Sequence, residues 1–340
     1  MCKKHTIGPY HQRSSMVNTS ARRLIYVCSQ DHAYTFRDMP EQLRERGVSG
    51  RVLSYEKLWG CRWLPRGTYV MTDFDRLSPM EHEIAGRLHD HLRGAGLQVL
   101  NNPHNFRPRD SLLKALHAEG LNGFTCYLPA AGEWPRRYPV FLRTIAAHRG
   151  VLSDLLHDRA AADAALMRAL NSGGLMRDLV FVEYAAEPQP ETGSFQKHAA
   201  FRVGPHIIRA NTVNDLGWMA KTGSEGIASA AQYLAERSEM EAYPHHDYVM
   251  RVFELAGLQF GRLDFGIVAG RPQTYEINTN PTMTLTTTHP NATRSETMGL
   301  VKSRLVSALA EVAKPVSWRP LPAPNYFRKR FVVGYRPWRF

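Results

Sequence analysis

The chain has 340 residues, 43% of them hydrophobic and 22% charged, so it is long enough for two or three domains with buried cores. No apolar run approaches the roughly 20 residues that a membrane helix needs. The four cysteines are scattered without a C-x-x-C pair, which argues against a disulfide framework and a zinc ribbon and predicts a cytoplasmic protein.

The net charge of +12 is concentrated at the two ends of the chain. Residues 1–23 hold five Lys or Arg and no acid, and residues 318–340 hold six and no acid. Basic ends are more often solvated or in contact with a partner than catalytic. We therefore expect a disordered basic extension over 1–22, with Met16 as an alternative start, and a basic tail over 316–340.

Strands and helices alternate in the first part of the chain. Alternation at this spacing predicts βαβ units and a small parallel sheet, in a domain over residues 23–105. The predicted strands are 24–28, 68–71 and 97–100, and the predicted helices are 36–46 and 79–93.

From residue 110 the order of elements changes to that of an α+β protein. We predict a central subdomain over 106–185 and a strand-rich subdomain over 186–315. The predicted helices are 111–119, 159–170, 224–237, 246–256 and 293–312, and the predicted strands are 124–127, 139–143, 179–182, 196–203 and 207–212.

A hairpin is predicted over residues 261–279, where two segments of alternating apolar and polar residues flank a four-residue turn over 269–272, centred on Gly270. Folding the segment about this turn places Asp264 opposite Glu276 and Arg262 opposite Asn278. Because side chains in a strand alternate between the two faces, all four share one face of the hairpin.

Two facing carboxylates repel each other unless a positive group lies between them. Mg²⁺ takes carboxylate and carbonyl oxygens and keeps sites for water and phosphate, so Asp264, Glu276 and Asn278 are candidate metal ligands. Arg262 can then reach a phosphate. The same pattern also fits a carboxylate pair neutralised by Arg262 alone, or a hairpin face exposed to solvent.

The runs GRLDF at 261–265 and YEINTNP at 275–281 resemble the metal-binding signature of ATP-grasp enzymes. In that superfamily an Asp, a Glu and an Asn hold two Mg²⁺ against the phosphates of ATP. The resemblance extends over about 101–313 and is closest to an uncharacterised RimK-like branch. It implies an ATP-grasp fold preceded by the small βαβ domain. It also implies that ATP and Mg²⁺ bind at the hairpin, with two metal ions as one possibility and Mn²⁺ as a substitute for Mg²⁺.

Segments before the hairpin resemble other ATP contacts of the superfamily, in the same order. Arg143 stands where the family usually has a phosphate-contacting Lys. Residues 147–150 would form the loop that closes over the phosphates. Glu183 and Tyr184 correspond to the linker beside the adenine. Arg202 corresponds to an arginine that contacts phosphate.

The resemblance implies a carboxylate–amine ligase that forms an acyl phosphate from ATP and an unidentified small acid or peptide, which an unidentified amine then attacks. Arg262 and Arg202 would act as catalytic cations, and Asn278 would serve both metal and nucleotide. A kinase of the same fold and a non-catalytic ATP-binding protein are the alternatives, with nucleic-acid binding by the basic ends the least favoured. The chain has no G-x-x-x-x-G-K-[ST], which excludes a P-loop. Self-association into a homo-oligomer remains open.

Overall fold

The structure of the chain is a computed structural model that describes residues 21–146, 150–221, 223, 226–283 and 285–325. Most of the predicted basic extension and basic tail, the start of the predicted helix 224–237 and most of the predicted loop 147–150 lie outside these residues.

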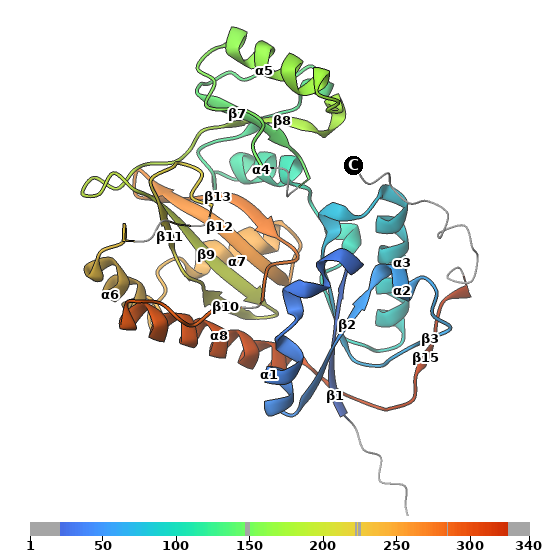
Figure 1. The fold of residues 1–340 in the computed structure, drawn as a ribbon. Helices are drawn as coiled ribbons and strands as arrows, with labels where there is room; N and C mark the ends of the chain where they lie inside the picture. The colour runs from blue at the N-terminus through green and yellow to red at the C-terminus, as the bar shows by residue number, and fades with distance from the viewer. Residues whose placement is uncertain (1–20, 147–149, 222, 224–225, 284, 326–340) are drawn as a thin grey trace, which may run out of the picture.

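The first part of the described chain is a parallel sheet with helices beside it (Figure 1). Its parallel strands run in the order β2-β1-β4-β5, and β14, from the far end of the sequence, adds to β1 antiparallel. The strands are β1 (Ala21–Cys28), β2 (Val48–Ser54), β4 (Thr68–Met71), β5 (Val99–Leu100) and β14 (Pro315–Val316). The α-helices are α1 (Met39–Glu45), α2 (Tyr55–Leu58) and α3 (Pro79–Gly94), and the 3-10 helices are η1 (Gln30–Phe36), η2 (Phe74–Arg76) and η3 (Pro103–Asn105).

Two short strands form a separate small sheet at the edge of this part. They are β3 (Trp63–Leu64) and β15 (Leu321–Pro322), which pair antiparallel. Both β14 and β15 fall within or next to the segment predicted as a basic tail, so this part of the tail folds back onto the first part of the chain, where β14 pairs with β1 and β15 with β3.

The central part is a three-stranded antiparallel sheet in the order β6-β8-β7, flanked by one long helix. The strands are β6 (Cys126–Tyr127), β7 (Val140–Thr144) and β8 (Leu179–Glu183). The helices are α4 (Arg109–Ala118), η4 (Pro129–Ala131), α5 (Arg159–Asn171) and η5 (Met176–Asp178). In Figure 1 β7, β8 and α5 stand apart from the rest, while α4 lies between them and the last sheet.

The last part is an antiparallel sheet in the order β10-β9-β12-β13, with β11 beside β9. The strands are β9 (Phe195–Val203), β10 (His206–Arg209), β11 (Val213–Asp215), β12 (Phe260–Val268) and β13 (Arg271–Asn278). The helices are α6 (Ala230–Ser238), α7 (His246–Leu255) and α8 (Ala292–Val312). The predicted α/β and α+β fold class is confirmed, because a parallel sheet is followed by two antiparallel ones.

Alternation along β12 and β9 divides the last core between two helices. Leu263 and Phe265 pack with α7, while Phe201, on the other face of the sheet, packs with α8. Burial of side chains on both faces fixes the register, since a slip by one residue would exchange the faces.

The segment after β13 docks on the parallel sheet, and this contact holds the first part of the chain beside the hairpin. The Tyr26 hydroxyl donates to Oδ1 of Asn280 at 2.6 Å, and the Phe74 amide donates to Oγ1 of Thr279 at 3.2 Å. Thr279 and Asn280 follow directly after β13, so these bonds place the ends of β1 and β4 beside the end of the strand that carries Glu276 and Asn278.

Two of the differences between the predicted and the observed elements lie in the first part of the chain. The predicted helix 36–46 begins only at Met39, next to Pro40, because proline is tolerated in the first turn of a helix and not in its interior. The strand β2 was not predicted, because Gly50 and Arg51 interrupt its apolar pattern; its pairing with β1 stabilises it.

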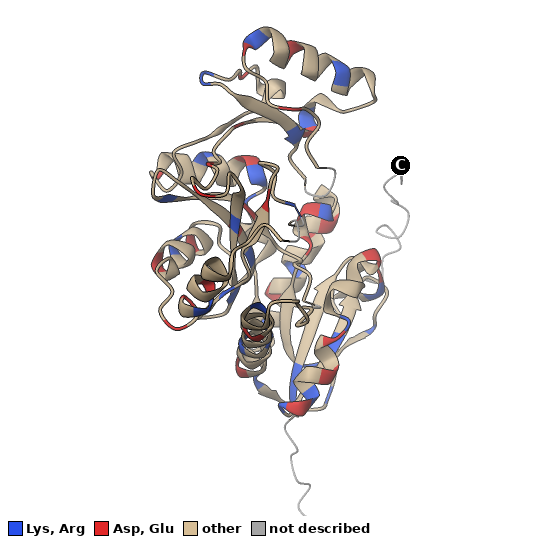
Figure 2. Ribbon diagram, turned by 60° about the vertical axis from the view of Figure 1, so that its left-hand side comes forward, with Lys and Arg blue, Asp and Glu red and all other residues tan. Residues whose placement is uncertain are grey.

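Charges of both signs are mixed along the helices of the described chain (Figure 2). None of the described helices is long and apolar enough to cross a membrane.

Candidate functional site

The β12–β13 hairpin brings together the four residues that the sequence predicts to face each other. Asp264 pairs with Glu276, and Arg262 pairs with Asn278. The predicted pairing is therefore confirmed, including the shared face.

This register is reached through a shorter turn than predicted. Only Ala269 and Gly270 form the turn, and both have positive φ, +47° and +73°. Such values match a type I′ hairpin turn, in which glycine is favoured and alanine is strained. A bulge then leaves Tyr275 as an extra residue of β13, which moves the partner of Asp264 from Tyr275 to Glu276.

Asp264 is 1% exposed, and two basic side chains surround its carboxylate. Arg262 binds both oxygens side-on, at 2.8 and 3.0 Å, and Lys197 Nζ lies 3.4 Å from Oδ2. Lys197 reaches this carboxylate because it lies two residues from Ala199, the partner of Asp264 on β9. A carboxylate held in this way keeps one orientation and retains lone pairs for a further cation.

Glu276 is paired with two arginines from other parts of the fold. Arg109 Nη2 contacts its Oε2 directly, and Arg143 Nη2 lies 3.6 Å from the same oxygen. Burial would raise the pKa of Glu276, but the two guanidinium charges outweigh it and lower the pKa to about 2. Burial and the neighbouring charge of Arg109 lower the pKa of Arg143 to about 10. Arg143 and Glu276 are therefore charged at neutral pH.

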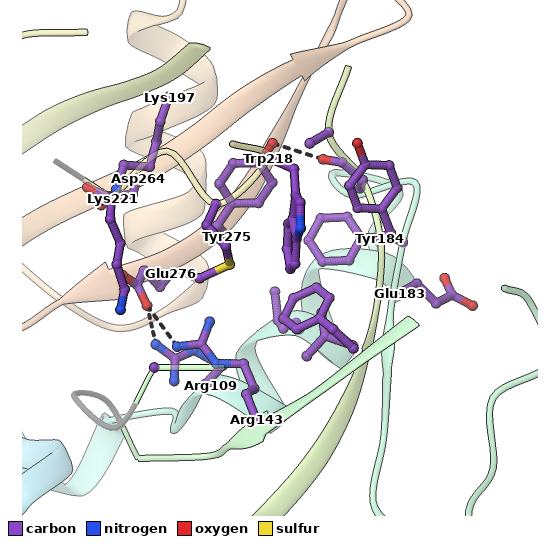
Figure 3. A pocket seen from close by; sticks show the side chains of 18 of the residues that line it. Arg109, Arg143, Glu183, Tyr184, Lys197, Trp218, Lys221, Asp264, Tyr275 and Glu276 are labelled. Carbon is purple, nitrogen blue, oxygen red and sulfur yellow. Dashed lines mark hydrogen bonds and ion pairs between the residues drawn. The ribbon is translucent and has the colours of Figure 1, made fainter. Parts of the chain in front are cut away.

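A cavity of about 250 Å³ lies between the hairpin and the central sheet, and its two ends differ in chemistry (Figure 3). One end is charged. The charged residues lining it are Arg109, Arg143, Lys197, Lys221, Asp264 and Glu276, and Asn278 lies beside them.

The other end of the cavity is a slot of aromatic and aliphatic side chains. Trp218 lies in it, with its ring 4.9 Å from that of Phe141 and 5.7 Å from that of Tyr184 between centroids. Leu113 and Val182 are among the aliphatic residues that line the cavity. The ring of Tyr275, which belongs to the hairpin, lies between this end and the charged residues (Figure 3).

Of the residues predicted to bind nucleotide, Arg143, Tyr184 and Asn278 line the cavity. Glu183 also borders it, but its side chain points away (Figure 3). Its carboxylate accepts hydrogen bonds from the Tyr127 hydroxyl at 2.7 Å and from Nε of Arg137 at 3.1 Å. The carboxylate of Glu183 is therefore engaged by protein groups.

Arg202 lies apart from the other predicted residues. It pairs with Gly261, so its side chain leaves the sheet on the face of Leu263, opposite to that of Asp264. There its Nε and Nη1 donate to the carbonyls of Gly204 and Leu258, both at 3.0 Å. The basic side chain that β9 directs to the cavity is Lys197.

The lining residues that were not among the predicted site residues include Arg109, Lys197, Lys221 and Trp218. The signal for Lys197 is alternation on β9, once its register against β12 is known. Lys221 and Trp218 lie in an irregular segment, and no local pattern marks them. Of the predicted loop 147–150, Gly150 lines the cavity, and a Cβ there would lie 3.3 Å from Lys221 Nζ.

The donor set at the charged end fits a hard divalent cation. Asp264 and Glu276 offer carboxylate oxygens and Asn278 a carboxamide oxygen, all toward one cavity. Among the described residues no group of three or more His, Cys, Asp or Glu could hold a metal, so a site here depends on the amide as third ligand. A cation would also have to replace Arg109 on Glu276.

The chain matches no protein-family model and none of the curated proteins. Solved structures do match it over most of its length. A RimK domain protein ATP-grasp from Sphaerobacter thermophilus is 15% identical, with 85% of this chain and 99% of that chain covered and a TM-score of 0.48. D-alanine–D-alanine ligase from Bacillus anthracis, complexed with ATP, is 14% identical, with 86% and 97% covered and a TM-score of 0.48.

A third similar structure is ATP-grasp ligase PsnB, complexed with a phosphomimetic variant of its minimal precursor, Mg and ADP. It is 13% identical, with 87% of this chain and 100% of that chain covered and a TM-score of 0.49. Two of these three structures carry the name of the superfamily that the hairpin sequence resembles. Identities this low leave the reaction to be inferred from the residues of the cavity.

Proposed function

We propose that the chain is an ATP-grasp enzyme, an ATP- and Mg²⁺-dependent carboxylate–amine ligase. The observation that carries the proposal is the cavity with two unlike ends, because a nucleoside triphosphate has the same division into an aromatic base and a polyanion. Four basic side chains against two carboxylates leave the charged end net positive, as a site for metal-bound triphosphate requires.

The adenine would occupy the aromatic end. Phe141, Tyr184 and Trp218 offer ring faces for stacking, and the residues from Glu183 to Ala186 line the same cavity. Backbone amides and carbonyls can read the hydrogen-bonding edge of a base. Trp218 would move to stack on the base or to admit it, since it now lies between the other two rings.

The triphosphate would lie along the charged end. Arg143, Lys197 and Lys221 come from three different segments and line this end. The Nε atoms of Arg109 and Arg143 are buried and have no hydrogen-bond partner in the described structure. Buried donors left without a partner are costly, so an anionic ligand that accepts from them would be stabilised.

Asp264, Glu276 and Asn278 would hold the metal, which supplies neutralisation of the charge that develops during phosphoryl transfer. Arg262 orients Asp264 through its two hydrogen bonds. The carboxylate of the first substrate would attack the γ-phosphorus, and ADP would leave. The amine would then attack the acyl carbon, lose a proton and release phosphate. Fixed cations beside the phosphates stabilise both anionic steps without reorganisation.

The direct test is calorimetry of ATP binding with and without Mg²⁺, for the wild type, Glu276→Gln and the exposed control Glu254→Gln. We expect Mg²⁺ to strengthen ATP binding by about tenfold or more in the wild type and control. In Glu276→Gln this gain should disappear, while metal-free ATP binds at least as well because Arg109 and Arg143 are released. An equal gain in all three proteins would show that Glu276 is not a metal ligand.

The reaction itself is tested by its products. A ligase screened with mixtures of acids, peptides and amines should release ADP and phosphate and form an amide, and a kinase would instead form ADP and a phosphorylated substrate. We also propose that Mn²⁺ substitutes for Mg²⁺ and that the enzyme acts in the cytoplasm.

A further inference from the structure

Arg109 connects three parts of the fold through one guanidinium group. It is the first residue of α4, its side chain is 7% exposed, and its Nη2 is bound to Oε2 of Glu276. Its Nη1 donates to the carbonyls of Thr144 at 3.3 Å and Ile145 at 2.9 Å. The carbonyl of Thr144 ends β7, and that of Ile145 follows it directly.

Two features make this arrangement more than a structural ion pair. The Nε of Arg109 is buried without a partner, although the other two nitrogens have three acceptors between them. In addition, Arg143 lies on the same oxygen of Glu276, so two like charges share one carboxylate. Like charges this close repel in a buried site, and the arrangement is stabilised when further negative charge arrives.

A metal ion that binds Oε2 of Glu276 would compete with Arg109 for the same oxygen. Oε2 cannot keep a close guanidinium and accept a divalent ion without strong repulsion between the two positive groups. The contact to Glu276 would therefore break when metal binds. The contacts to Thr144 and Ile145 involve a different nitrogen, so they can persist.

We propose that Arg109 is a positioning residue that occupies the place of the metal on Glu276 and exchanges the carboxylate for phosphate when the metal nucleotide binds. Nη1 stays on the carbonyls at the end of β7 during this exchange, which ties that end of the central sheet to the bound phosphates. The inference rests on the proposed function and assigns to Arg109 a role that differs from that of Arg143. Arg143 is a phosphate contact, whereas Arg109 is also a competitor of the metal.

The exchange predicts effects of opposite sign on two ligands tested separately. The probes are Mn²⁺ without nucleotide, followed by calorimetry or by its paramagnetic resonance signal, and ADP without metal. In Arg109→Gln we expect Mn²⁺ alone to bind about tenfold more tightly, because a like charge is removed from the ligand carboxylate. ADP without metal should bind about tenfold more weakly, because the charged end of the cavity loses one positive charge and the Glu276 carboxylate is left less neutralised.

Arg143→Gln is the matched comparison, since the same change is made 3.6 Å from the same carboxylate oxygen. Arg143→Gln should weaken the binding of ADP without metal by a similar factor. It should strengthen the binding of Mn²⁺ by less than Arg109→Gln does. If Arg109→Gln binds Mn²⁺ no more tightly than the wild type, Arg109 does not compete with the metal and the inference is wrong.

Glu276→Gln gives a second test that does not require a change at Arg109, in case Arg109→Gln does not fold. It releases Arg109, so metal-free ADP should bind several-fold more tightly than to the wild type; unchanged ADP affinity would also overturn the inference. A wild type that binds neither Mn²⁺ nor ADP contradicts the proposed function itself. A wild type that binds both, with equal affinities in Arg109→Gln, contradicts only the role of Arg109.

Discussion

The last sheet borders two clusters of arginine and carboxylate that differ in how completely their hydrogen bonds are satisfied. In the closed cluster (Arg209, Glu236, Glu239 and Arg294), Arg209 donates to both glutamates, at 2.9 Å to Glu236 and 2.7 Å to Glu239. Arg294 binds the second oxygen of Glu236. The Thr212 amide donates to Oε1 of Glu236 at 2.8 Å, and the Thr212 hydroxyl accepts from Nη2 of Arg209.

The open cluster (Arg109, Arg143 and Glu276) has the same residue types and a similar degree of burial. Here two arginines converge on one oxygen, and the Nε of each is buried without a partner in the described structure. It lines a cavity, whereas the closed cluster joins β10 to α6 and α8.

The difference separates a structural network from a binding site. A buried network in which no buried nitrogen lacks a partner stabilises one packing arrangement, and removal of one member leaves a charge unpaired. A network with spare donors and excess positive charge is completed only by an anion. Substitutions in the closed cluster should therefore change stability, and those in the open cluster should change binding.

The largest effect is expected for Glu236→Gln in the closed cluster. Glu236 is 5% exposed and neutralises two arginines, so its loss should lower the free energy of unfolding by about 3–5 kcal/mol. Urea denaturation measures this change. The control is Glu241→Gln, which removes a carboxylate that is 67% exposed and should cost at most about 1 kcal/mol. Equal losses in the two variants would contradict the structural role of the closed cluster.

Arg143→Gln in the open cluster should weaken ligand binding and leave the free energy of unfolding nearly unchanged. We expect ATP affinity to fall by about 2 kcal/mol, since a charged donor to phosphate is removed. Stability should change little, because the loss of contact with Glu276 is offset by relief of repulsion with Arg109. Calorimetry and denaturation of the same sample measure both. Arg177→Gln, at a side chain that is 80% exposed, is the control and should change neither. A large loss of stability with unchanged ATP affinity would assign Arg143 to structure.

The sequence allows the hairpin half of the open cluster to be predicted and leaves out the other half. Asp264 and Glu276 could be paired because strand alternation and turn chemistry are local patterns, and the bulge at Tyr275 corrects for the shorter turn. Arg109 is separated from Glu276 by 167 positions, and no local pattern joins them.

The prediction for β9 shows why a register is needed as well as a strand. Arg202 and Lys197 are both basic residues of one strand, and alternation places them on opposite faces. The choice between them depends on pairing with β12, which is set by packing of Phe201 on α8 and of Ala200 in the core with Leu263. Such packing is a property of the whole fold, so the sequence alone could not decide it.

His198, which lies beside Thr212 near the closed cluster, should make the free energy of unfolding depend on pH. Burial, and then the charges of Arg209 and His245, lower its pKa from 6.5 to about 3. The unfolded chain therefore takes up a proton on this histidine between these values and the folded chain does not, so stability is complete above pH 6.5 and falls as the pH is lowered. At pH 5.5 the loss should be about 1.4 kcal/mol.

Denaturation at pH 8 and 5.5 tests this for the wild type, His198→Gln and the control His246→Gln, whose side chain is 50% exposed. The change in stability between the two pH values should shrink by that amount in His198→Gln only. An unchanged pH dependence would show that His198 binds its proton equally in both states.

Trp218→Ala should give the smallest effect and separates the two ends of the cavity. Loss of one aromatic stacking partner should weaken ATP by about 1 kcal/mol, roughly fivefold. Inorganic tripolyphosphate has no base, so its affinity should stay the same, in contrast to Arg143→Gln, which should weaken both. Trp318→Ala removes a side chain that is 63% exposed and serves as the control for both ligands. If Trp218→Ala binds ATP more tightly, Trp218 blocks the slot rather than stacking on the base, and the aromatic end would be occupied only after it moves out.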